Sequence, residues 1–480
     1  MAESVPRPRT GPVVGIALAA ALGGFLFGFD TSVINGAVDA LAGAFDLGAA
    51  LKGFAVSSAL LGSVIGAWFA GSLANRFGRI PVMLVSAVLF LISAIGSGLA
   101  FGVVDLIAWR VVGGIGVGAA SVIAPAYIAE VAPARIRGRL GSLQQLAIVL
   151  GIFVALLSNA VLAAVSGGAA EILWFGLPAW RWMFMAEAIP AIVYGVLALR
   201  LPESPRYLVL REREDQAAEV LETYTGEVDV VGRIDQIRSS IASDRRESLR
   251  DLVGSTFGLK PIVWVGILLS MFQQFVGINV IFYYSTTLWR SVGFDESSAM
   301  LTSVISSVTN IVTTIVAIVL VDKVGRRAML LAGSVLMAVA LGTMALAFSF
   351  ATTSGGEVTL GQPWALIALV AANLFVVGFG ATWGPVVWVL LGEMFPNRIR
   401  ASALAVAAAA QWVANFFIST TFPVFSEISL TFAYGFYTFF AVLSFFFVWW
   451  RVAETKGKEL EEMSDEAPVS RRRNRAEGGT

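Results

Sequence analysis

Twelve long apolar runs occupy most of this chain and constrain its fold more than any other feature. Each run has about 20 residues, the length that an α-helix needs to cross the hydrocarbon core of a bilayer. The composition agrees, because 57% of the 480 residues are hydrophobic and only 14% are charged. The sequence therefore predicts an all-α integral membrane protein with spans near residues 13–36, 53–74, 80–101, 104–128, 140–165, 180–201, 260–288, 297–321, 328–350, 363–391, 401–424 and 433–451.

The runs fall into two groups of six that carry the same charged motifs in the same order. Two basic residues flank a glycine after the second run of each group, at 76–79 and 323–326. A glutamate followed seven residues later by an arginine comes after each fourth run, and Glu-Ser or Glu-Thr comes after each sixth run. Three motif pairs in one order indicate an internal duplication. Two six-helix halves are an architecture typical of transporters.

Basic residues set the predicted orientation, since cytoplasmic connections of membrane proteins carry an excess of Lys and Arg. The connections rich in arginine all lie on one side if twelve helices alternate in direction, and both chain ends lie on that same side. We therefore predict a cytoplasmic leader, an N-terminal six-helix half, an intracellular helical linker, a C-terminal six-helix half and a cytoplasmic tail, at 1–12, 13–201, 202–259, 260–452 and 453–480.

The chain contains no cysteine and no histidine. Disulfides, thiolate metal sites and cysteine nucleophiles are thereby excluded, and the commonest metal ligand and general base are missing. We expect no cofactor, no metal and no enzymatic activity. Nothing in the sequence indicates a nucleic-acid partner.

Three ionisable residues lie inside apolar runs of the first half, namely Asp30, Arg110 and Glu187. A charge at membrane depth is costly unless it is paired, so such residues are functional candidates by default. Pairing of Asp30 with Arg110 and burial act in opposite directions on the carboxylate, which suits a group whose protonation changes with conformation. The alternative interpretation is a purely structural ion pair.

Carboxamides and tryptophans form a second set within the runs. Carboxamides donate and accept hydrogen bonds, as the hydroxyl groups of a sugar do. The alternative role of such amides is to link membrane helices to one another. The set comprises Gln145, Gln273, Gln274, Asn279, Asn310, Gln411 and Asn415, with Trp388 and Trp412 beside them.

Several motifs resemble those of the sugar porter family within the major facilitator superfamily. They are Pro-Glu-Ser-Pro-Arg at 202–206, Gln-Gln-Phe-Val-Gly-Ile-Asn at 273–279, Tyr-Tyr at 283–284 and Gly-Pro-Val-Val-Trp at 384–388. The resemblance covers roughly residues 13–460 and is strongest to bacterial sugar–proton symporters. It implies the major facilitator fold, with twelve helices in two pseudo-symmetric halves.

The resemblance also implies roles for individual residues. It places the proton-coupling site at Asp30, Arg110 and Glu187. The implied sugar-contacting or pocket-lining residues are Phe25, Gln145, Gln273, Gln274, Asn279, Tyr283, Asn310, Phe379, Gly384, Trp388 and Gln411, to which the residue pattern adds Trp412 and Asn415. The implied inner gate of inter-helix salt bridges comprises Arg79, Glu130, Arg137, Glu203, Arg206, Arg326, Glu393, Arg400 and Glu454.

We therefore expect a proton-coupled monosaccharide symporter of the cytoplasmic membrane, working as a monomer by alternating access. We expect a hexose such as glucose as its substrate. An uncoupled facilitator is the nearest alternative, and the aspartate at position 30 argues against it by resemblance, because facilitators of the family typically have asparagine there. A sugar sensor is a second alternative, and the short tail after Thr455 argues against an added signalling domain.

Overall fold

The computed structural model describes residues 10–133, 137–225, 229–243, 249–354, 357–396 and 399–456. Among these residues, twelve helical segments are long and apolar enough to cross a membrane. The predicted fold class is therefore confirmed, and the spans follow the predicted order along the chain. Most of the predicted leader and tail, including the arginines at 471–473, lies outside the described residues.

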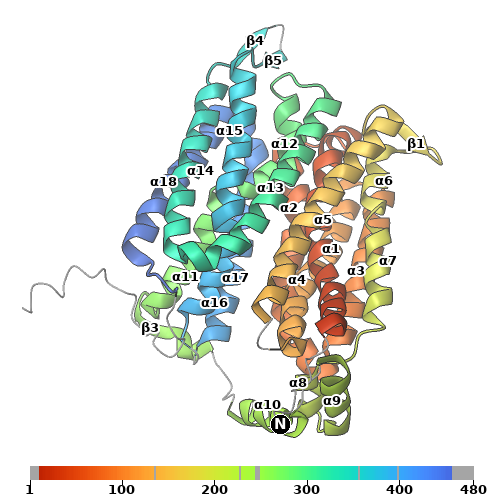
Figure 1. The fold of residues 1–480 in the computed structure, drawn as a ribbon. Helices are drawn as coiled ribbons and strands as arrows, with labels where there is room; N and C mark the ends of the chain where they lie inside the picture. Colours follow the sequence, from red (N-terminus) through yellow and green to blue (C-terminus); the bar gives the residue numbers. More distant parts are fainter. Residues whose placement is uncertain are drawn as a thin grey trace, which may run out of the picture. The chain divides into compact units, whose positions relative to one another are not determined.

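The first six spans are formed by seven helices, because the sixth span is divided into two helices, which lie end to end in Figure 1. The break lies at Ala186 and Glu187, between two shorter helices. The helices are α1 (Thr10–Ala44), α2 (Ala49–Phe77), α3 (Arg79–Leu99), α4 (Val103–Val131), α5 (Arg137–Ser166), α6 (Ala179–Met185) and α7 (Ala188–Ala198).

The last six spans also contain breaks. The seventh is interrupted at Val276–Gly277, where Gly277 has a φ of 82°, and the tenth contains a π-helical turn, η3 (Phe379–Trp383). The helices are α11 (Pro261–Phe275), α12 (Ile278–Arg290), α13 (Glu296–Val324), α14 (Arg326–Phe348), α15 (Trp364–Gly378), α16 (Gly384–Met394), α17 (Arg400–Ile428) and α18 (Leu430–Arg451).

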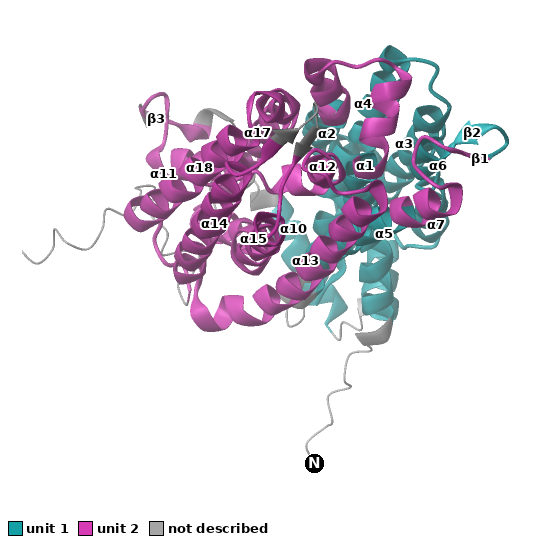
Figure 2. Cartoon of the chain, turned by 90° about the horizontal axis from the view of Figure 1, so that it is seen from above, with its two compact units in different colours: residues 1–34, 58–158, 174–246 teal, residues 35–57, 159–173, 247–480 magenta. Residues whose placement is uncertain are grey.

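Two compact units make up the chain, and they differ from the halves drawn on the sequence (Figure 2). Unit 1 contains residues 1–34, 58–158 and 174–246, and unit 2 contains residues 35–57, 159–173 and 247–480. Unit 2 thus includes the end of α1 and the start of α2. In it, the side-chain nitrogen of Asn35 donates to the Phe282 carbonyl at 2.9 Å, and the hydroxyls of Ser57 and Thr420 lie 2.6 Å apart.

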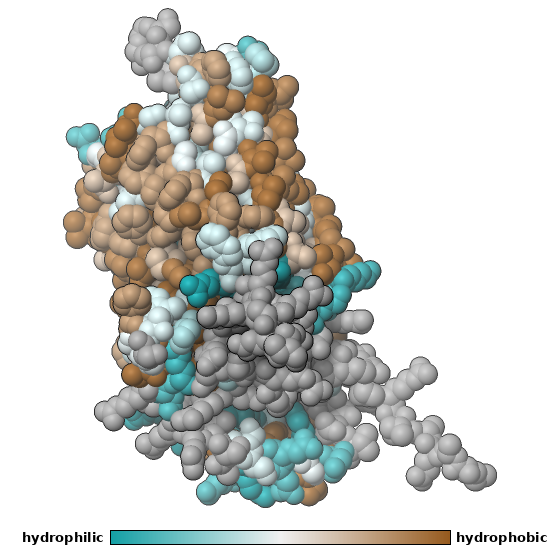
Figure 3. All heavy atoms as spheres, turned by 90° about the vertical axis from the view of Figure 1, so that its left-hand side faces the viewer, coloured by the Kyte–Doolittle hydropathy of each residue, from teal (hydrophilic) through white to brown (hydrophobic). Residues whose placement is uncertain are grey.

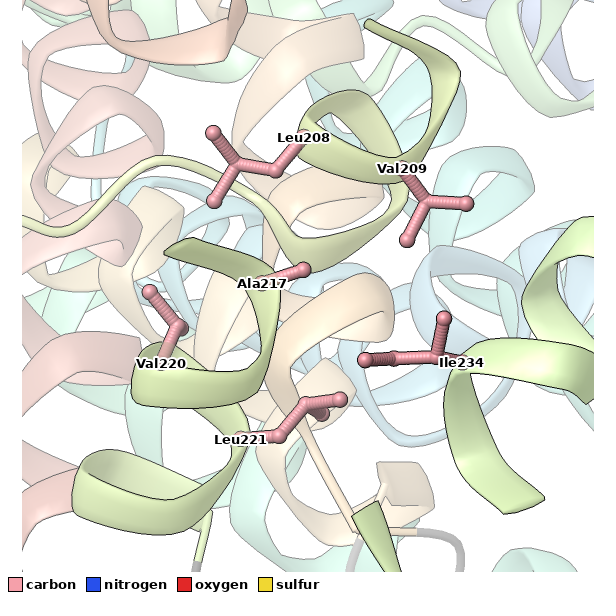
Figure 4. Close-up of a cluster of buried hydrophobic side chains, with 6 residues drawn as sticks. All are labelled: Leu208, Val209, Ala217, Val220, Leu221 and Ile234. Atoms are coloured by element: carbon pink, nitrogen blue, oxygen red, sulfur yellow. The ribbon is translucent and has the colours of Figure 1, made fainter. Parts of the chain in front are cut away.

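The linker predicted at 202–259 begins with short helices that belong to unit 1. They are α8 (Pro205–Leu210), α9 (Glu214–Val220), the π-helical turn η1 (Leu221–Thr225) and α10 (Val230–Ser243). Ser204 caps α8 by accepting from the Tyr207 amide, and Pro205 starts the helix with its φ already fixed. The helices close around a small apolar core, shown in Figure 4, of Leu208, Val209, Ala217, Val220, Leu221 and Ile234.

β-Structure is confined to short segments in the connections. Strand β1 (Ile172–Trp174) pairs with β2 (Leu177–Pro178) just before α6. Strands β4 (Thr352–Ser354) and β5 (Glu357–Thr359) are antiparallel, with Thr352 opposite Thr359. A 3₁₀ turn, η2 (Leu249–Leu252), and β3 (Val253–Thr256) precede α11.

Apolar side chains cover much of the outer surface, as expected for helices that face lipid. Figure 3 shows one face on which hydrophobic residues dominate the middle and hydrophilic residues gather at the lower end. On α18, for example, Phe439, Trp449 and Trp450 are more than half exposed. Exposing such rings to water would lower the stability of a soluble protein, so this surface supports the membrane assignment.

Candidate functional site

An ion pair lies inside the membrane-spanning part of unit 1. Arg110 Nη1 on α4 is 3.2 Å from Asp30 Oδ1 on α1, and the same nitrogen donates to the Asp30 backbone carbonyl at 3.0 Å. Both side chains are at most 2% exposed. The Arg110 guanidinium also lies over the ring of Phe184, 5.9 Å from its centre. The structure thus brings together two of the three residues predicted to couple the proton.

The third residue, Glu187, joins the same cluster from the break between α6 and α7. It is 1% exposed and interacts electrostatically with both Asp30 and Arg110. Two carboxyl groups therefore face one guanidinium, which leaves one negative charge without a counter-charge unless a proton binds. Asp30 Oδ2 and Glu187 Oε1 have no hydrogen-bond partner among the described residues. The cluster is therefore suited chemically to take up and release one proton.

Three carboxamides form a hydrogen-bonded chain in unit 2. Asn279 Nδ2 donates to Gln274 Oε1 at 2.6 Å, and Gln274 Nε2 donates to Gln273 Oε1 at 3.4 Å. On a continuous helix, residues five apart point about 140° away from each other. The interruption at Gly277 ends the helix of the glutamines and lets Asn279 turn toward Gln274. The chain continues to the tenth span, where Gln273 Nε2 donates to the carbonyls of Trp383 and Gly384 at 2.9 and 3.1 Å.

The π-helical turn η3 positions further candidate residues of unit 2. It begins at Phe379 and ends just before Gly384, the first residue of α16. Gly380 in this turn lies directly against the Asn310 side chain of α13. One helical turn into α16, the Trp388 ring is 42% exposed. The turn thus gathers Asn310, Phe379 and Gly384 near the carbonyls that Gln273 binds.

The α17 candidates lie along one stretch of that helix. Asn415 is buried and accepts from the Ser419 hydroxyl at 3.0 Å, and the Ser419 carbonyl accepts from Tyr284 at 2.7 Å. Gln411 Oε1 has no hydrogen-bond partner among the described residues. Trp412 is half-buried, and Tyr283 on α12 is buried.

The remaining predicted sugar residues, Phe25 on α1 and Gln145 on α5, belong to unit 1. Both are half-buried, and the Phe25 ring centre is 6.3 Å from that of Phe29. The candidate sugar residues are therefore divided between the two compact units, with most of them in unit 2.

A charged network sits at the predicted cytoplasmic ends of the helices in unit 1. Arg79, at the start of α3, binds Glu130 on α4 through two nitrogens, at 2.9 and 2.8 Å. The Glu203 carboxylate accepts from the backbone amides of Arg79 and Ile80 at 3.0 and 3.2 Å. Ser204 donates to Glu130 at 2.5 Å. One helix start is thus capped by a carboxylate and tied to a second helix by an ion pair.

Unit 2 contains the same network from the second copy of the motifs. Arg326 binds Glu393 at 2.9 and 2.7 Å. Glu454 accepts from the amides of Arg326 and Arg327 at 2.9 and 3.0 Å, and Thr455 donates to Glu393 at 2.6 Å. The duplication inferred from sequence motifs is therefore repeated in these hydrogen bonds, and Arg326 has in addition an ion pair with Asp322 at 3.0 Å.

Glycine is required at the start of each network. Gly78 and Gly325 have φ values of 105° and 100°, which L side chains rarely adopt. A Cβ atom at either glycine would also collide with the capping carboxylate, that of Glu203 or Glu454. The glycine of each basic motif therefore lets the carboxylate reach the helix start.

Several predicted gate residues are placed differently from the sequence interpretation. Arg400, which the seven-residue spacing matched to Glu393, instead donates to the Phe395 carbonyl at 3.2 and 3.0 Å. Arg206 donates to Ser240 within the linker at 3.3 Å. Arg137 begins α5, and its side chain lies outside the described part of the structure. Sequence reasoning missed the hydroxyls of Ser204 and Thr455, although their matching places after the sixth and twelfth runs were a usable signal.

The twelve spans, the charge cluster buried among them and the duplicated network define a polytopic membrane transporter. Residues 16–467 match the sugar (and other) transporter family. The chain is 57% identical over 466 residues to the "Glucose transport protein" of Synechocystis, covering 96% of this chain and 99% of that protein. It is 40% identical to the "D-xylose-proton symporter" of Escherichia coli, covering 94% and 95%.

The chain is also similar to solved structures of sugar transporters. The partially occluded inward open conformation of the xylose transporter XylE from E. coli superposes with a TM-score of 0.81 at 38% identity, covering 94% of this chain and all of that chain. The chain therefore belongs to the sugar transporter family.

Proposed function

We propose that this protein is a proton-coupled monosaccharide symporter with a hexose such as glucose as its substrate. The observation that carries the coupling is the buried cluster of Asp30, Glu187 and Arg110, which has one carboxyl group more than it has cations. The names of the relatives support a monosaccharide as the substrate, since one is a glucose transport protein and another a xylose–proton symporter.

Carboxamides of unit 2 supply the chemistry for a sugar. Gln273, Gln274 and Asn279 together offer several N–H donors and carbonyl acceptors, and a sugar hydroxyl uses both kinds. Hydrogen bonds among the three hold their orientations before any ligand arrives. A preorganised set of this kind loses little conformational entropy on binding. The exposed Trp388 ring adds an aromatic face for the apolar side of a sugar ring.

Coupling follows from the different charge of the cluster in its two protonation states. When both carboxyl groups are ionised, Arg110 must balance two negative charges. A proton on either carboxyl group makes the cluster neutral, and a proton on Asp30 also weakens the hold of Arg110 on α1, because Arg110 then pairs with Glu187 alone. If proton and sugar both favour the same conformational change, each promotes the other's transport without direct contact. The inner networks of Arg79–Glu130 and Arg326–Glu393 are proposed to stabilise one of the alternating conformations.

The proposed setting is the cytoplasmic membrane, with both termini on the cytoplasmic side and the chain working as a monomer. The asymmetric distribution of arginines supports the orientation. In this orientation α1 runs outward, and α6 and α7 run inward.

Sugar uptake by proteoliposomes under an imposed inward proton gradient tests this proposal. A panel of labelled hexoses, pentoses and cyclic polyols should include one sugar that accumulates above its outside concentration, and the accumulation should vanish when the gradient is collapsed. Equilibration without accumulation would identify a facilitator. Absence of uptake of every member of the panel would contradict the substrate class.

A further inference from the structure

Tyr194 is a fully buried tyrosine of α7 that none of the sites above uses. Its side chain is 0% exposed, and its hydroxyl has no hydrogen-bond partner among the described residues. A hydroxyl that is buried without a partner in an apolar interior is unfavourable. Such a group calls for a ligand, a water molecule or a transient partner.

The hydroxyl lies against α1 at Gly23. A Cβ atom at Gly23 would be 3.0 Å from the Tyr194 oxygen and 3.3 Å from Cβ of Ala120 on α4. Glycine at this position therefore leaves the space that the hydroxyl occupies. The contact lies between α1 and α7, as the cluster of Asp30 and Glu187 does, since Asp30 lies on α1 and Glu187 immediately precedes α7.

The Gly23–Tyr194 contact and the Asp30–Glu187 cluster are separated by the same number of residues on both helices. Gly23 lies seven residues before Asp30 on α1, and Tyr194 lies seven residues after Glu187 along α7. Seven residues are close to two full turns, so each pair lies on one face of its helix. The spacing corresponds to about 10 Å along the axis. In the proposed orientation, Tyr194 therefore lies inward of the carboxyl cluster, on the cytoplasmic side.

A further polar group without a partner lies at the same level. The carboxamide of Gln144, on α5, packs against Gly24, the residue after Gly23. Gln144 is 8% exposed, and neither its Nε2 nor its Oε1 has a hydrogen-bond partner among the described residues. Two buried polar groups thus flank the Gly23–Gly24 pair on the inward side of the proton cluster.

We propose that Tyr194 relays the proton between the Asp30–Glu187 cluster and the cytoplasm. The inference rests on the proposed function, because it needs a proton to leave that cluster. A proton released by Glu187 passes through a short chain of hydrogen-bonded water to the phenolic oxygen. As that oxygen accepts it, the phenol gives its own hydrogen to the next acceptor on the cytoplasmic side. Tyr194 ends each transfer neutral and unchanged in composition, and no other reactant is needed.

Tyr194→Phe tests the relay, because phenylalanine fills the same space without the hydroxyl. Proteoliposomes that contain a pH-sensitive dye report proton entry driven by sugar, and labelled sugar reports net uptake and equilibrium exchange. Net uptake requires that the proton leave, whereas exchange at equal pH does not. We expect proton-coupled uptake to fall about a hundredfold, the low end of the loss of a positioned proton-transfer group, while exchange falls much less.

Tyr434→Phe is the matched control. Tyr434 in unit 2 is also fully buried, and its hydroxyl likewise has no hydrogen-bond partner among the described residues. We expect its variant to behave as the wild type in both assays. A second test leaves the tyrosine in place: Gly23→Ala puts a methyl group 3.0 Å from the Tyr194 oxygen, which must then shift, and should give the same split. Gly15→Ala on the same helix is its control, since a Cβ there meets nothing within 4 Å.

The outcomes separate the relay from the proposed function. Wild-type coupled uptake in both Tyr194→Phe and Gly23→Ala would overturn the relay alone, as would an equal loss of uptake and exchange in Tyr194→Phe. If the wild-type protein itself moved sugar without moving protons, the relay and the proposed symport would both fall.

Discussion

Glu203 and Glu454 each cap the start of a membrane helix with one carboxylate, and replacing either tests whether the two networks are equivalent. Each carboxylate accepts from two successive backbone amides of the first turn, at 2.9–3.2 Å. A hydrogen bond to a charged group contributes about 1.5–3 kcal/mol. Glutamine at these positions keeps one acceptor but loses the charge and its interaction with the helix dipole, which contributes about 0.3–1 kcal/mol.

We therefore expect Glu203→Gln to lower the free energy of unfolding by about 2 kcal/mol, from the loss of one charge-assisted bond and the dipole term. Glu454→Gln should cost at least as much, because its carboxylate accepts from the two corresponding amides of a helix start and also from the Lys456 amide. The double variant should show the sum of the two losses, since the carboxylates share no partner. The measurement is the folded fraction in mixed micelles as denaturing detergent increases. Glu427→Gln, at an exposed glutamate near the end of α17, is the control and should leave stability unchanged.

A larger loss for Glu203→Gln would refute this reasoning. If Glu203→Gln destabilised the protein by more than about 1 kcal/mol beyond Glu454→Gln, about the net contribution of one ordinary hydrogen bond, the amide contacts of the two carboxylates would not set their contributions to stability. If neither variant lost stability, the carboxylate caps would contribute nothing.

Three further predictions concern other parts of the molecule. Burial raises the pKa of the Glu454 carboxyl, but hydrogen bonds from the backbone amides of Lys456, Arg326, Arg327 and Thr455 outweigh this effect and hold the pKa below its ordinary 4.5. The difference in free energy of unfolding between wild type and Glu454→Gln should therefore be constant above about pH 6 and shrink as the pH falls below about 4. Arg110→Met should destabilise the protein by about 3–5 kcal/mol, because it leaves buried carboxylates without their cation, and adding Asp30→Asn should recover part of that loss in the same detergent titration. Gln274→Leu should raise the sugar concentration for half-maximal exchange about tenfold, the loss expected for one or two hydrogen bonds to a neutral ligand.

Each of these has a contrary result. A stability difference for Glu454→Gln that grows in acid would reverse the assigned pKa shift. No recovery in the double variant would mean that Asp30 and Arg110 are not energetically coupled, and unchanged half-saturation in Gln274→Leu would remove Gln274 from the sugar site.

Much of the fold could be predicted because membrane spans depend on a single strong signal. Twenty apolar residues form a helix in lipid whatever their neighbours are, since backbone groups there must bond within their own segment. The breaks in those helices could not be predicted in the same way. Glu187 and Pro190 lie at the first break, and Gly380, Gly384 and Pro385 lie at the second. Such residues do not by themselves predict a break, since Pro125 lies inside the unbroken helix α4, so packing against other helices must decide where the helices are interrupted.

The candidate sites divide along the same line. Asp30, Arg110 and Glu187 were recognisable because ionisable residues in apolar runs are few. The pairings of the inner gate were less so: the repeated seven-residue spacing and the family resemblance matched Glu393 to Arg400. The helix in fact ends at Met394, so Arg400 turns to the Phe395 carbonyl, and Glu393 binds Arg326 from a distant part of the chain. Sequence offsets reveal that a motif is duplicated, but only the fold shows which residues within it meet.

The most direct test of proton coupling compares Asp30→Asn with the wild type in two assays on the same proteoliposomes. Asp105→Asn, at an aspartate of the same unit near the start of α4, serves as the control and should match the wild type in both. The account predicts that Asp30→Asn exchanges labelled sugar across the membrane but does not accumulate it under an inward proton gradient. Undiminished accumulation by Asp30→Asn would contradict the assignment of this cluster to proton coupling.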